Sequence, residues 1–238
     1  MPHEQMDQQQ VAQYLHIDIR ELEKLSSRGL IPCRKVKDRF VYRKGAIDQW
    51  IESQMHRMDR PRLRGIARGV DRHHGFVENQ AMIRPLIPPG GVICPLKATS
   101  RDSVLRSLVK AAADAGLVYA KDELLAEIKA REQLCTTALI PGVALPHPRH
   151  PLPYDIEASF IIVGLTASGI PFGSADGLLT RLFFLICCKD DRTHLHVLAR
   201  IGLMLHDPGS VDDLLTTESA QELGLKLQQL EQKAIEAG

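Results

Sequence analysis

Two histidines stand in sequence surroundings that suit phosphoryl transfer. His147 ends an apolar segment that starts at Gly142 and is bounded by glycine and proline, and His194 opens a segment with helical periodicity. A histidine after such a segment is expected to be held rigid and exposed, and its imidazole can accept a phosphoryl group and pass it on. A histidine at a helix N-terminus can lie across the same site, where free N–H groups and the helix dipole favour an anion. The pair therefore predicts a phosphohistidine site.

Metal and hydrolase chemistry use some of the same residue types. Ligand types suitable for zinc are present in His147, His150, His194, His196 and Cys135. However, His-x-x-His in a proline-rich loop together with His-x-His on a helix is not a spacing typical of structural zinc sites. A serine hydrolase with a nucleophile elbow would need a Gly-x-Ser-x-Gly segment, which the sequence lacks. We therefore expect no metal and no cofactor, and we interpret His150 and His196 as bystanders.

The elements around these histidines alternate between amphipathic helices and strands that are apolar throughout. Strands of this kind are typical of a sheet that is buried on both faces. Turn residues at 168–172 and 175–177 separate the two strands. The pattern predicts an α/β layered domain. In chain order we expect a helix capped by Ser100 or Asp102, a helix over 121–131, strands at 159–165 and 182–185, a helix over 194–206, and one or two helices within 210–235.

Four stretches in this part of the chain carry a family resemblance. They are Arg131-Glu132-Gln133-Leu134-Cys135-Thr136-Thr137, Gly142 to His147, Gly169 to Phe172 with Asp176-Gly177, and His194-Leu195-x-x-Leu198-Ala199. In this order they resemble the enzyme IIA proteins of the fructose–mannitol–nitrogen class of the bacterial phosphotransferase system, over about residues 92–232. The resemblance implies a mixed sheet flanked by helices.

The same resemblance implies roles for four residues. His147 takes the phosphoryl group, on Nε2, from a phosphorylated histidine-containing carrier protein. His194 lies close to it and hydrogen-bonds the phosphoryl oxygens. Arg131 offers a cationic fork to a phosphate or to the incoming carrier, and Thr137 is a further candidate for a hydroxyl donor.

The residue after the acceptor histidine departs from the family pattern. The family usually has glycine there, whereas this chain has Pro148, which supplies no backbone N–H. Arg149 is a candidate to substitute as a charge donor. The departure leaves a non-phosphorylated sensor domain as an alternative.

The N-terminal part of the chain shows the order helix, turn, helix, basic hairpin, helix. Two short helices fall within 8–28, where Asp18 is a suitable N-cap for the second and Gly29 a suitable terminator. A hairpin around 37–39 and a third helix from Lys44 to about Met55 follow. This is the layout of a winged helix-turn-helix. The segments Val11-Ala12-Gln13-Tyr14-Leu15, Arg28-Gly29-Leu30-Ile31-Pro32 and Asp48-Gln49-Trp50-Ile51 resemble the excisionase or MerR-like DNA-binding family.

The second of these helices is the predicted recognition helix, with its N-terminal residues in the major groove of DNA. Arg20 is the candidate for reading bases, and Lys24 and Arg28 are candidates for phosphate contacts. The predicted wing residues over the DNA backbone or minor groove are Arg34, Lys35, Lys37 and Arg39. The alternative is a solvated basic hairpin in a domain that binds another protein. One module of this size covers little DNA, so useful affinity calls for a homodimer or for tandem sites.

The distribution of charge separates the two parts. Residues 1–75 carry 15 Lys or Arg and 10 Asp or Glu, a net charge of +5, while the rest of the chain carries −4. A basic N-terminal third predicts an anionic partner for that third. The 5 cysteines are scattered, as in a reduced cytosolic protein. The N-terminus lacks the apolar core of a signal peptide and no stretch is long enough to span a membrane, so we expect a cytoplasmic location without membrane contact.

Together these observations predict three segments. Residues 1–55 form a winged helix-turn-helix domain, 56–91 an arginine-, proline- and glycine-rich linker, and 92–238 the enzyme IIA domain. The predicted function is regulation, in which phosphorylation of His147 by the carrier protein tunes binding to double-stranded DNA or to other regulatory proteins. The alternatives are a phosphocarrier that passes phosphate to a sugar permease, and a non-phosphorylated interaction scaffold.

Overall fold

The computed structural model describes residues 5–15, 17–55, 58, 60–65, 81–174 and 176–236. The chain divides into two compact units, 1–78 and 79–238. The part of the predicted linker between 66 and 80 lies outside the described residues. No described helix is both long enough and apolar enough to cross a membrane.

The N-terminal unit has the predicted winged helix-turn-helix layout. Its elements are β1 (Gln5–Met6), α1 (Gln8–Leu15), α2 (Ile19–Ser27), β2 (Arg34–Val36), β3 (Arg39–Arg43) and α3 (Lys44–Met55). The side chain of Asp18 caps α2 by accepting the backbone N–H of Arg20 at 2.8 Å. Gly29 ends this helix with φ +66°, a conformation that favours glycine. Both predicted signals of helix α2 are therefore confirmed.

The wing is a three-stranded antiparallel sheet in the order β1-β3-β2. The β2–β3 turn is short, because Val36 pairs with Arg39, and its first residue, Lys37, has φ +55°. Beneath the wing, the buried hydroxyl groups of Tyr42 and Ser26 lie 2.7 Å apart and join β3 to the recognition helix α2. This buried hydrogen bond thus connects the wing to α2, the helix that is expected to bind DNA together with it.

The N-terminal unit continues beyond the third helix. Residues 60–65 are helical, and Leu63 is buried. The guanidinium of Arg62 forms an ion pair with Glu21 of α2 at 3.0 Å. One arginine of the predicted linker, Arg62, therefore lies against the recognition helix α2.

The C-terminal unit is built on a mixed four-stranded sheet in the order β4-β6-β7-β5. The long central strands β6 (Phe160–Ile170) and β7 (Thr180–Cys187) are antiparallel, with Phe160 opposite Cys187. The edge strands β4 (Val92–Ile93) and β5 (Val143–Ala144) run parallel to their neighbours. The predicted mixed sheet is confirmed, and its two central strands are the predicted ones.

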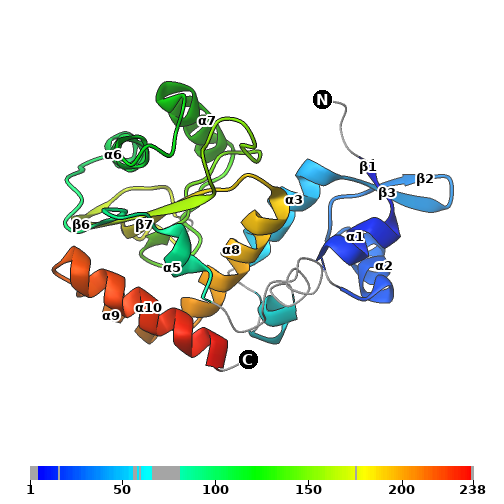
Figure 1. The fold of residues 1–238 in the computed structure, drawn as a ribbon. Coiled ribbons are helices and arrows are strands. Elements are labelled where there is room, and N and C mark those ends of the chain that lie inside the picture. The colour runs from blue at the N-terminus through cyan, green and yellow to red at the C-terminus, as the bar shows by residue number, and fades with distance from the viewer. Residues whose placement is uncertain are drawn as a thin grey trace. The chain divides into compact units, whose positions relative to one another are not determined.

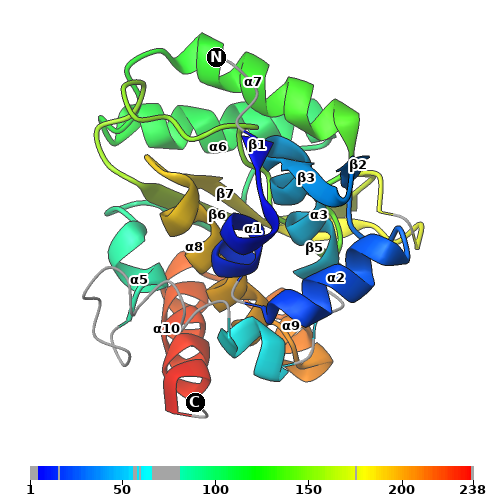
Figure 2. The ribbon, with the colours of Figure 1, turned by 90° about the vertical axis from the view of Figure 1, so that its right-hand side faces the viewer.

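Helices cover both faces of this sheet (Figure 1 and Figure 2). On one face lie α6 (Arg101–Asp114) and α7 (Lys121–Leu134), whose apolar residues pack against Phe160, Ile162, Phe183 and Leu185. On the other face lie α5 (Ile83–Leu86), α8 (Asp191–Met204), α9 (Pro208–Leu215) and α10 (Ala220–Glu236). Because apolar side chains project from both faces of β6 and β7, both layers of helices are needed to bury them.

Several predicted bounds differ from those of the structure, and three of the differences lie close to the site. Strand β6 extends to Ile170, which pairs with Thr180 beyond a register shift, so 168–170 are strand rather than turn. Helix α7 continues to Leu134 instead of ending at residue 131. Helix α8 begins at Asp191 rather than 194, because the carboxylate of Asp190 accepts the backbone N–H of Thr193 at 2.9 Å and caps the helix early.

A buried carboxylate fastens the start of the C-terminal unit. Glu231 of α10 is 1% exposed and accepts the backbone N–H groups of Met82, Ile83 and Arg84 at 2.5, 2.6 and 3.0 Å. These N–H groups lie at the beginning of the short helix α5 and have no partner within that helix. Contacts of the C-terminal unit therefore begin before residue 92.

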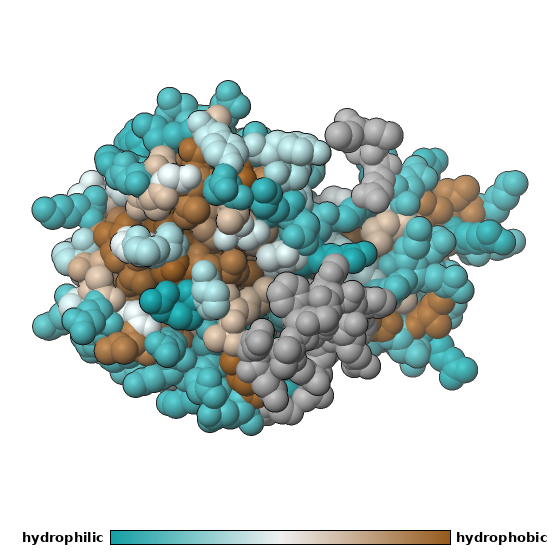
Figure 3. Space-filling model, viewed as in Figure 1, coloured by the Kyte–Doolittle hydropathy of each residue, from teal (hydrophilic) through white to brown (hydrophobic). Residues whose placement is uncertain are grey.

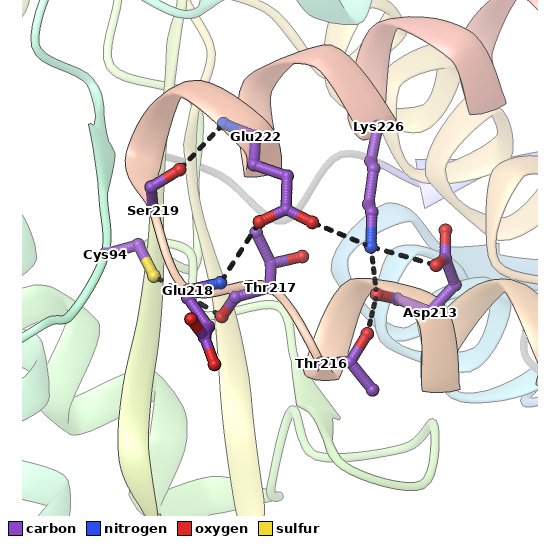
Figure 4. A network of polar contacts seen from close by, with 8 residues as sticks. All are labelled: Cys94, Asp213, Thr216, Thr217, Glu218, Ser219, Glu222 and Lys226. Atoms are coloured by element: carbon purple, nitrogen blue, oxygen red, sulfur yellow. Dashed lines mark hydrogen bonds and ion pairs between the residues drawn. The ribbon is translucent and has the colours of Figure 1, made fainter.

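The turn between α9 and α10 is held by a polar network (Figure 4). The ammonium group of Lys226 donates to the carboxylate of Asp213 at 2.9 Å and pairs with Glu222 at 3.2 Å. The thiol of Cys94, which follows β4, donates to the carbonyl oxygen of Thr217 at 3.8 Å. This network joins the turn to the sheet edge on the side opposite to β5.

Candidate functional site

His147 lies three residues after the edge strand β5, in a segment that is held on both sides. Gly142 has φ +75° in a tight turn, where the N–H of Val143 donates to the carbonyl of Ile140 at 2.9 Å. Residues 143–144 then pair with β7, and the carbonyl of Pro146 accepts the N–H of Ile186 at 2.9 Å. The segment before His147 is therefore held on both sides, by the turn at Gly142 and by the hydrogen bond at Pro146.

The imidazole of His147 is oriented by its own backbone. Its Nδ1 lies 2.7 Å from the carbonyl oxygen of Leu145. A carbonyl oxygen can only accept a hydrogen bond, so Nδ1 carries the proton of the neutral ring and Nε2 carries the lone pair. The nucleophilic atom of His147 is therefore Nε2.

The predicted exposure of His147 is wrong, because its side chain is only 3% exposed. The loop bends the ring back over Leu145, and the ring of His194 lies against it. The following Pro148 is also buried, whereas Arg149 and His150 are exposed.

His194 is brought to His147 by helix α8. The centroids of the two rings are 4.9 Å apart, and the ring planes are tilted by 53°. His194 is the fourth residue of the helix rather than its first, and its N–H donates to the carbonyl of Asp190. The first turn also carries the carboxylates of Asp190 and Asp191, which already complement the helix dipole. His194 therefore contributes its ring to the site, while the helix terminus itself also carries two carboxylates.

Arg131 and Thr137 flank the end of helix α7, and both are buried. Nη1 of Arg131 donates to the carbonyl of Cys135 at 2.8 Å, which satisfies a carbonyl at the helix C-terminus. The hydroxyl of Thr137 donates to the carboxylate of Glu132 at 2.6 Å. The carbonyl of Thr137 accepts the N–H of Leu145 at 3.2 Å, so this segment lies beside the strand of His147.

Comparison with known proteins matches this domain to a family. Residues 86–229 match the model of the family described as "Phosphoenolpyruvate-dependent sugar phosphotransferase system, EIIA 2". The chain belongs to this enzyme IIA family. Residues 6–55 match the model of a helix-turn-helix domain, so a helix-turn-helix domain precedes the IIA domain.

The relatives of the IIA domain come from two branches of the family. Over 144 residues the chain is 31% identical to a nitrogen regulatory protein of Bradyrhizobium diazoefficiens, a match that covers 59% of this chain and 91% of the relative. It is 30% identical over 129 residues to the mannitol-specific phosphotransferase enzyme IIA component of Staphylococcus aureus, covering 54% of this chain and 85% of that protein. Among solved structures, the nitrogen regulatory protein IIA-Ntr from Neisseria meningitidis superposes with a TM-score of 0.55 at 22% identity, over 62% of this chain and 99% of that one. The last comparison shows the shared fold.

The zinc arrangement considered from the sequence has no counterpart among the described residues. No group of three or more His, Cys, Asp or Glu side chains in the described ranges could hold a metal ion. His150 is exposed in the loop after His147, and His196 is buried on α8.

His196 makes the stability of the IIA domain depend on pH. Burial, together with the guanidinium of Arg200, lowers the pKa of His196 from 6.5 to about 4. The unfolded chain therefore binds a proton between these two pH values that the folded protein does not bind. The contribution of this residue to the free energy of unfolding is complete above about pH 6.5. It falls by about 3 kcal/mol as the pH is lowered to about 4, at about 1.4 kcal/mol per pH unit.

We expect the variant His196→Phe to lose this pH dependence. Urea unfolding at pH 6.5 and at pH 5 should show the wild type losing about 2 kcal/mol more than the variant over this interval. His150→Gln, which changes an exposed histidine, should keep the wild-type slope. Equal slopes for His196→Phe and wild type would contradict the prediction.

The candidate DNA-binding residues of the N-terminal unit share one property, since all of them are exposed. They are Arg20, Lys24 and Arg28 at the recognition helix and Arg34, Lys35, Lys37 and Arg39 in the wing. Most of the surface of this unit that is visible in Figure 3 is hydrophilic. The wing carries a clear excess of positive charge, since Asp38 is its one acidic residue, and it is suited to a polyanion. In the recognition helix α2, Glu21 and Glu23 balance the charges of Arg20 and Lys24.

Sequence reasoning did not single out Glu132 as a functional residue. It is 3% exposed and accepts both donors of Thr137. The available signal was its place in the stretch from Arg131 to Thr137 that resembles the family, where the sequence assigned no role to Glu132 itself. Its partner could be recognised only when the end of helix α7 and the fold of the following loop were known.

Proposed function

We propose that the IIA domain accepts a phosphoryl group on Nε2 of His147 from a phosphorylated histidine carrier protein of the phosphotransferase system. The observation that carries this proposal is the hydrogen bond from Nδ1 of His147 to the carbonyl of Leu145. This hydrogen bond leaves the lone pair of the neutral ring on Nε2. The ring of His194, a second polar group, lies beside it, with the two ring centroids 4.9 Å apart. Phosphoryl transfer depends mainly on such positioning and on stabilisation of charge.

The transfer proceeds from one imidazole to another. The lone pair of Nε2 forms the new N–P bond, and the electron pair of the broken N–P bond remains on the imidazole of the carrier. His147 keeps its Nδ1 proton, so the phosphorylated ring is positively charged, and the carbonyl oxygen of Leu145 stabilises that charge. Because His147 is 3% exposed, we expect Nε2 to become accessible when the carrier docks. Arg149, exposed next to Pro148, is the proposed donor in place of the N–H that proline lacks.

The experiment is incubation of the full chain with phosphoenolpyruvate, enzyme I and the carrier protein, followed by intact-mass analysis. The proposal predicts a gain of one phosphoryl group that is labile to acid. If the mass stays unchanged while a known IIA protein is phosphorylated in parallel, the protein is a non-phosphorylated scaffold instead.

We further propose that the phosphorylated state tunes binding of the helix-turn-helix domain to double-stranded DNA. The fusion of the two domains and the charge split of +5 against −4 support this proposal. Phosphorylation adds negative charge to the acidic part of the chain, which can then compete with DNA for the basic segment. A homodimer would enlarge the small footprint of a single module. The proposal makes the protein a regulator of the nitrogen class, in line with its 31% identical relative.

We expect the full chain to bind duplex DNA with a steep dependence on salt. Five or six phosphate contacts would give a log–log slope near −5, at about −0.9 per contact. Fluorescence anisotropy on a duplex selected from a random-sequence pool measures this slope. Arg20→Ala should change the preferred sequence, whereas Lys37→Asn should weaken all sequences alike. Asparagine is the matched choice at Lys37 because it tolerates the φ of +55° there.

The same titration with phosphorylated protein tests the coupling. We expect weaker binding by a factor of about 5 to 150, the usual range for coupled sites. A flat salt response would contradict DNA binding. If the DNA affinities of the two forms agree within about twofold, phosphorylation of the IIA domain does not control DNA binding. Its target would then be another regulatory protein.

A phosphocarrier that serves a sugar permease is the second candidate. It is favoured by the 30% identity to a protein named as a mannitol-specific phosphotransferase enzyme IIA component. The preceding helix-turn-helix domain favours the regulator. Transfer of labelled phosphate from the protein to a sugar, in the presence of permease-containing membranes, would decide for the phosphocarrier.

A further inference from the structure

Glu132 stands at one end of a chain of hydrogen bonds that ends on the acceptor imidazole. Its carboxylate accepts the backbone N–H of Thr137 at 3.0 Å and the hydroxyl of Thr137 at 2.6 Å. The carbonyl of Thr137 accepts the N–H of Leu145 at 3.2 Å. The carbonyl of Leu145 in turn accepts Nδ1–H of His147 at 2.7 Å. The buried carboxylate of Glu132 on α7 is thus connected through three hydrogen-bonded steps to the imidazole of His147.

Leu145 directly follows strand β5, and its backbone groups link Thr137 to the ring of His147. Along a strand, the N–H and C=O groups of one residue point to the same edge, and those of the next residue point to the other edge. The carbonyl of Pro146 bonds to Ile186 beyond the end of the β5–β7 pairing. Both groups of Leu145 therefore point away from β7, the N–H to Thr137 and the C=O to His147. The residue whose carbonyl orients the ring is therefore the residue whose N–H is bonded to Thr137.

Glu132 is suited to hold Thr137 because it sits on a rigid element. It lies in the last turn of α7 and is 3% exposed. Burying a carboxylate is costly unless hydrogen bonds compensate it, and both of its oxygens accept from Thr137. The neighbouring Thr136 is tied by its hydroxyl to the carbonyl of Phe172 at 3.2 Å. The segment beside Leu145 is therefore anchored to α7 and to the end of β6.

We propose that Glu132 is a positioning residue for phosphoryl transfer. Through Thr137 and Leu145 it keeps the proton of His147 on Nδ1 and directs the lone pair of Nε2 into the site. Thr137 serves in this series of hydrogen bonds, with its hydroxyl donating to the carboxylate of Glu132, rather than as a donor to the phosphoryl group. The inference rests on the proposed function, but the tautomer of His147 can be measured without phosphorylation.

Two pairs of matched variants test the proposal. Glu132→Leu removes both acceptors, whereas Glu132→Gln keeps one acceptor for the N–H and offers its amide to the hydroxyl oxygen. Thr137→Val removes the hydroxyl at nearly constant shape, whereas Thr137→Ser keeps it. Thr137→Val also covers the case in which Glu132→Leu does not fold, since it leaves the backbone bond to Glu132 in place.

The first readout is the tautomer of His147 in the full chain. A long-range ¹H–¹⁵N spectrum at pH 8, assigned with His147→Ala, should show only the Nδ1–H form in the wild type. Glu132→Leu and Thr137→Val should populate the Nε2–H form, and Glu132→Gln and Thr137→Ser should resemble the wild type.

The second readout is the rate of phosphorylation by the carrier. Misplacement of a reacting group by about 1 Å costs about 10²-fold, so kcat should fall by up to this factor while KM for the carrier is retained.

The outcomes separate the two proposals. Folded Thr137→Val or Glu132→Leu protein with a wild-type tautomer would overturn the role of Glu132, even if its thermal stability is lower. A wild type that is never phosphorylated, together with the expected tautomer shifts, would overturn the proposed function and leave the positioning chain standing.

Discussion

The variant His147→Ala is expected to take up no phosphoryl group from the carrier protein. The reason is the geometry of the acceptor, since Nε2 of His147 is the atom that the Leu145 carbonyl leaves with a lone pair. Without this imidazole the site retains His194, whose proposed role is only to hydrogen-bond the phosphoryl oxygens. Intact-mass analysis after incubation with phosphoenolpyruvate, enzyme I and the carrier measures the outcome.

The control for this variant is His150→Ala. His150 lies three residues after the acceptor and is exposed, so it is the histidine nearest in sequence that the carrier could phosphorylate by chance. His150→Ala should be phosphorylated as fully as the wild type. Phosphate retained by His147→Ala, or mapped by peptide analysis to His150 or His194, would assign the acceptor elsewhere.

The variant His194→Ala is expected to slow the transfer by about 10² to 10³, by analogy with the loss of one donor from an oxyanion hole. Its ring lies 4.9 Å from that of His147, centroid to centroid, and comes from a different element of the fold. It can therefore hydrogen-bond a phosphoryl group on Nε2 without contributing to the new bond. Rapid-quench measurement of single-turnover transfer from the phosphorylated carrier gives the rate, and peptide mapping should still find the phosphate on His147.

His194→Gln is the matched variant, because its amide retains a hydrogen-bond donor at a similar distance from the helix. It should lose less rate than His194→Ala. A rate for His194→Ala equal to that of the wild type would make His194 a packing residue, and the electrostatic part of the site would have to come from Arg131 or Arg149.

The sequence by itself determined the order of the elements and the identity of the paired histidines. The helix signals of the N-terminal unit are local, which is why Asp18 and Gly29 mark the ends of α2 correctly. The apolar runs of β6 and β7 could be recognised because both faces of the central strands are buried. The four motifs in order pointed to the enzyme IIA family, which the comparisons confirm.

Only the tertiary structure decided how the site is arranged. The edge strands β4 and β5 have two residues each, too few for a periodic pattern, and they exist because they pair with longer neighbours. The burial of His147 depends on the ring of His194 and the fold of its own loop, neither of which is local in the sequence. The role proposed for Glu132 likewise depends on the contact between Thr137 and Leu145, which lie eight residues apart in the chain. Local signals determine elements, whereas the tautomer and accessibility of a nucleophile follow from how separate segments pack.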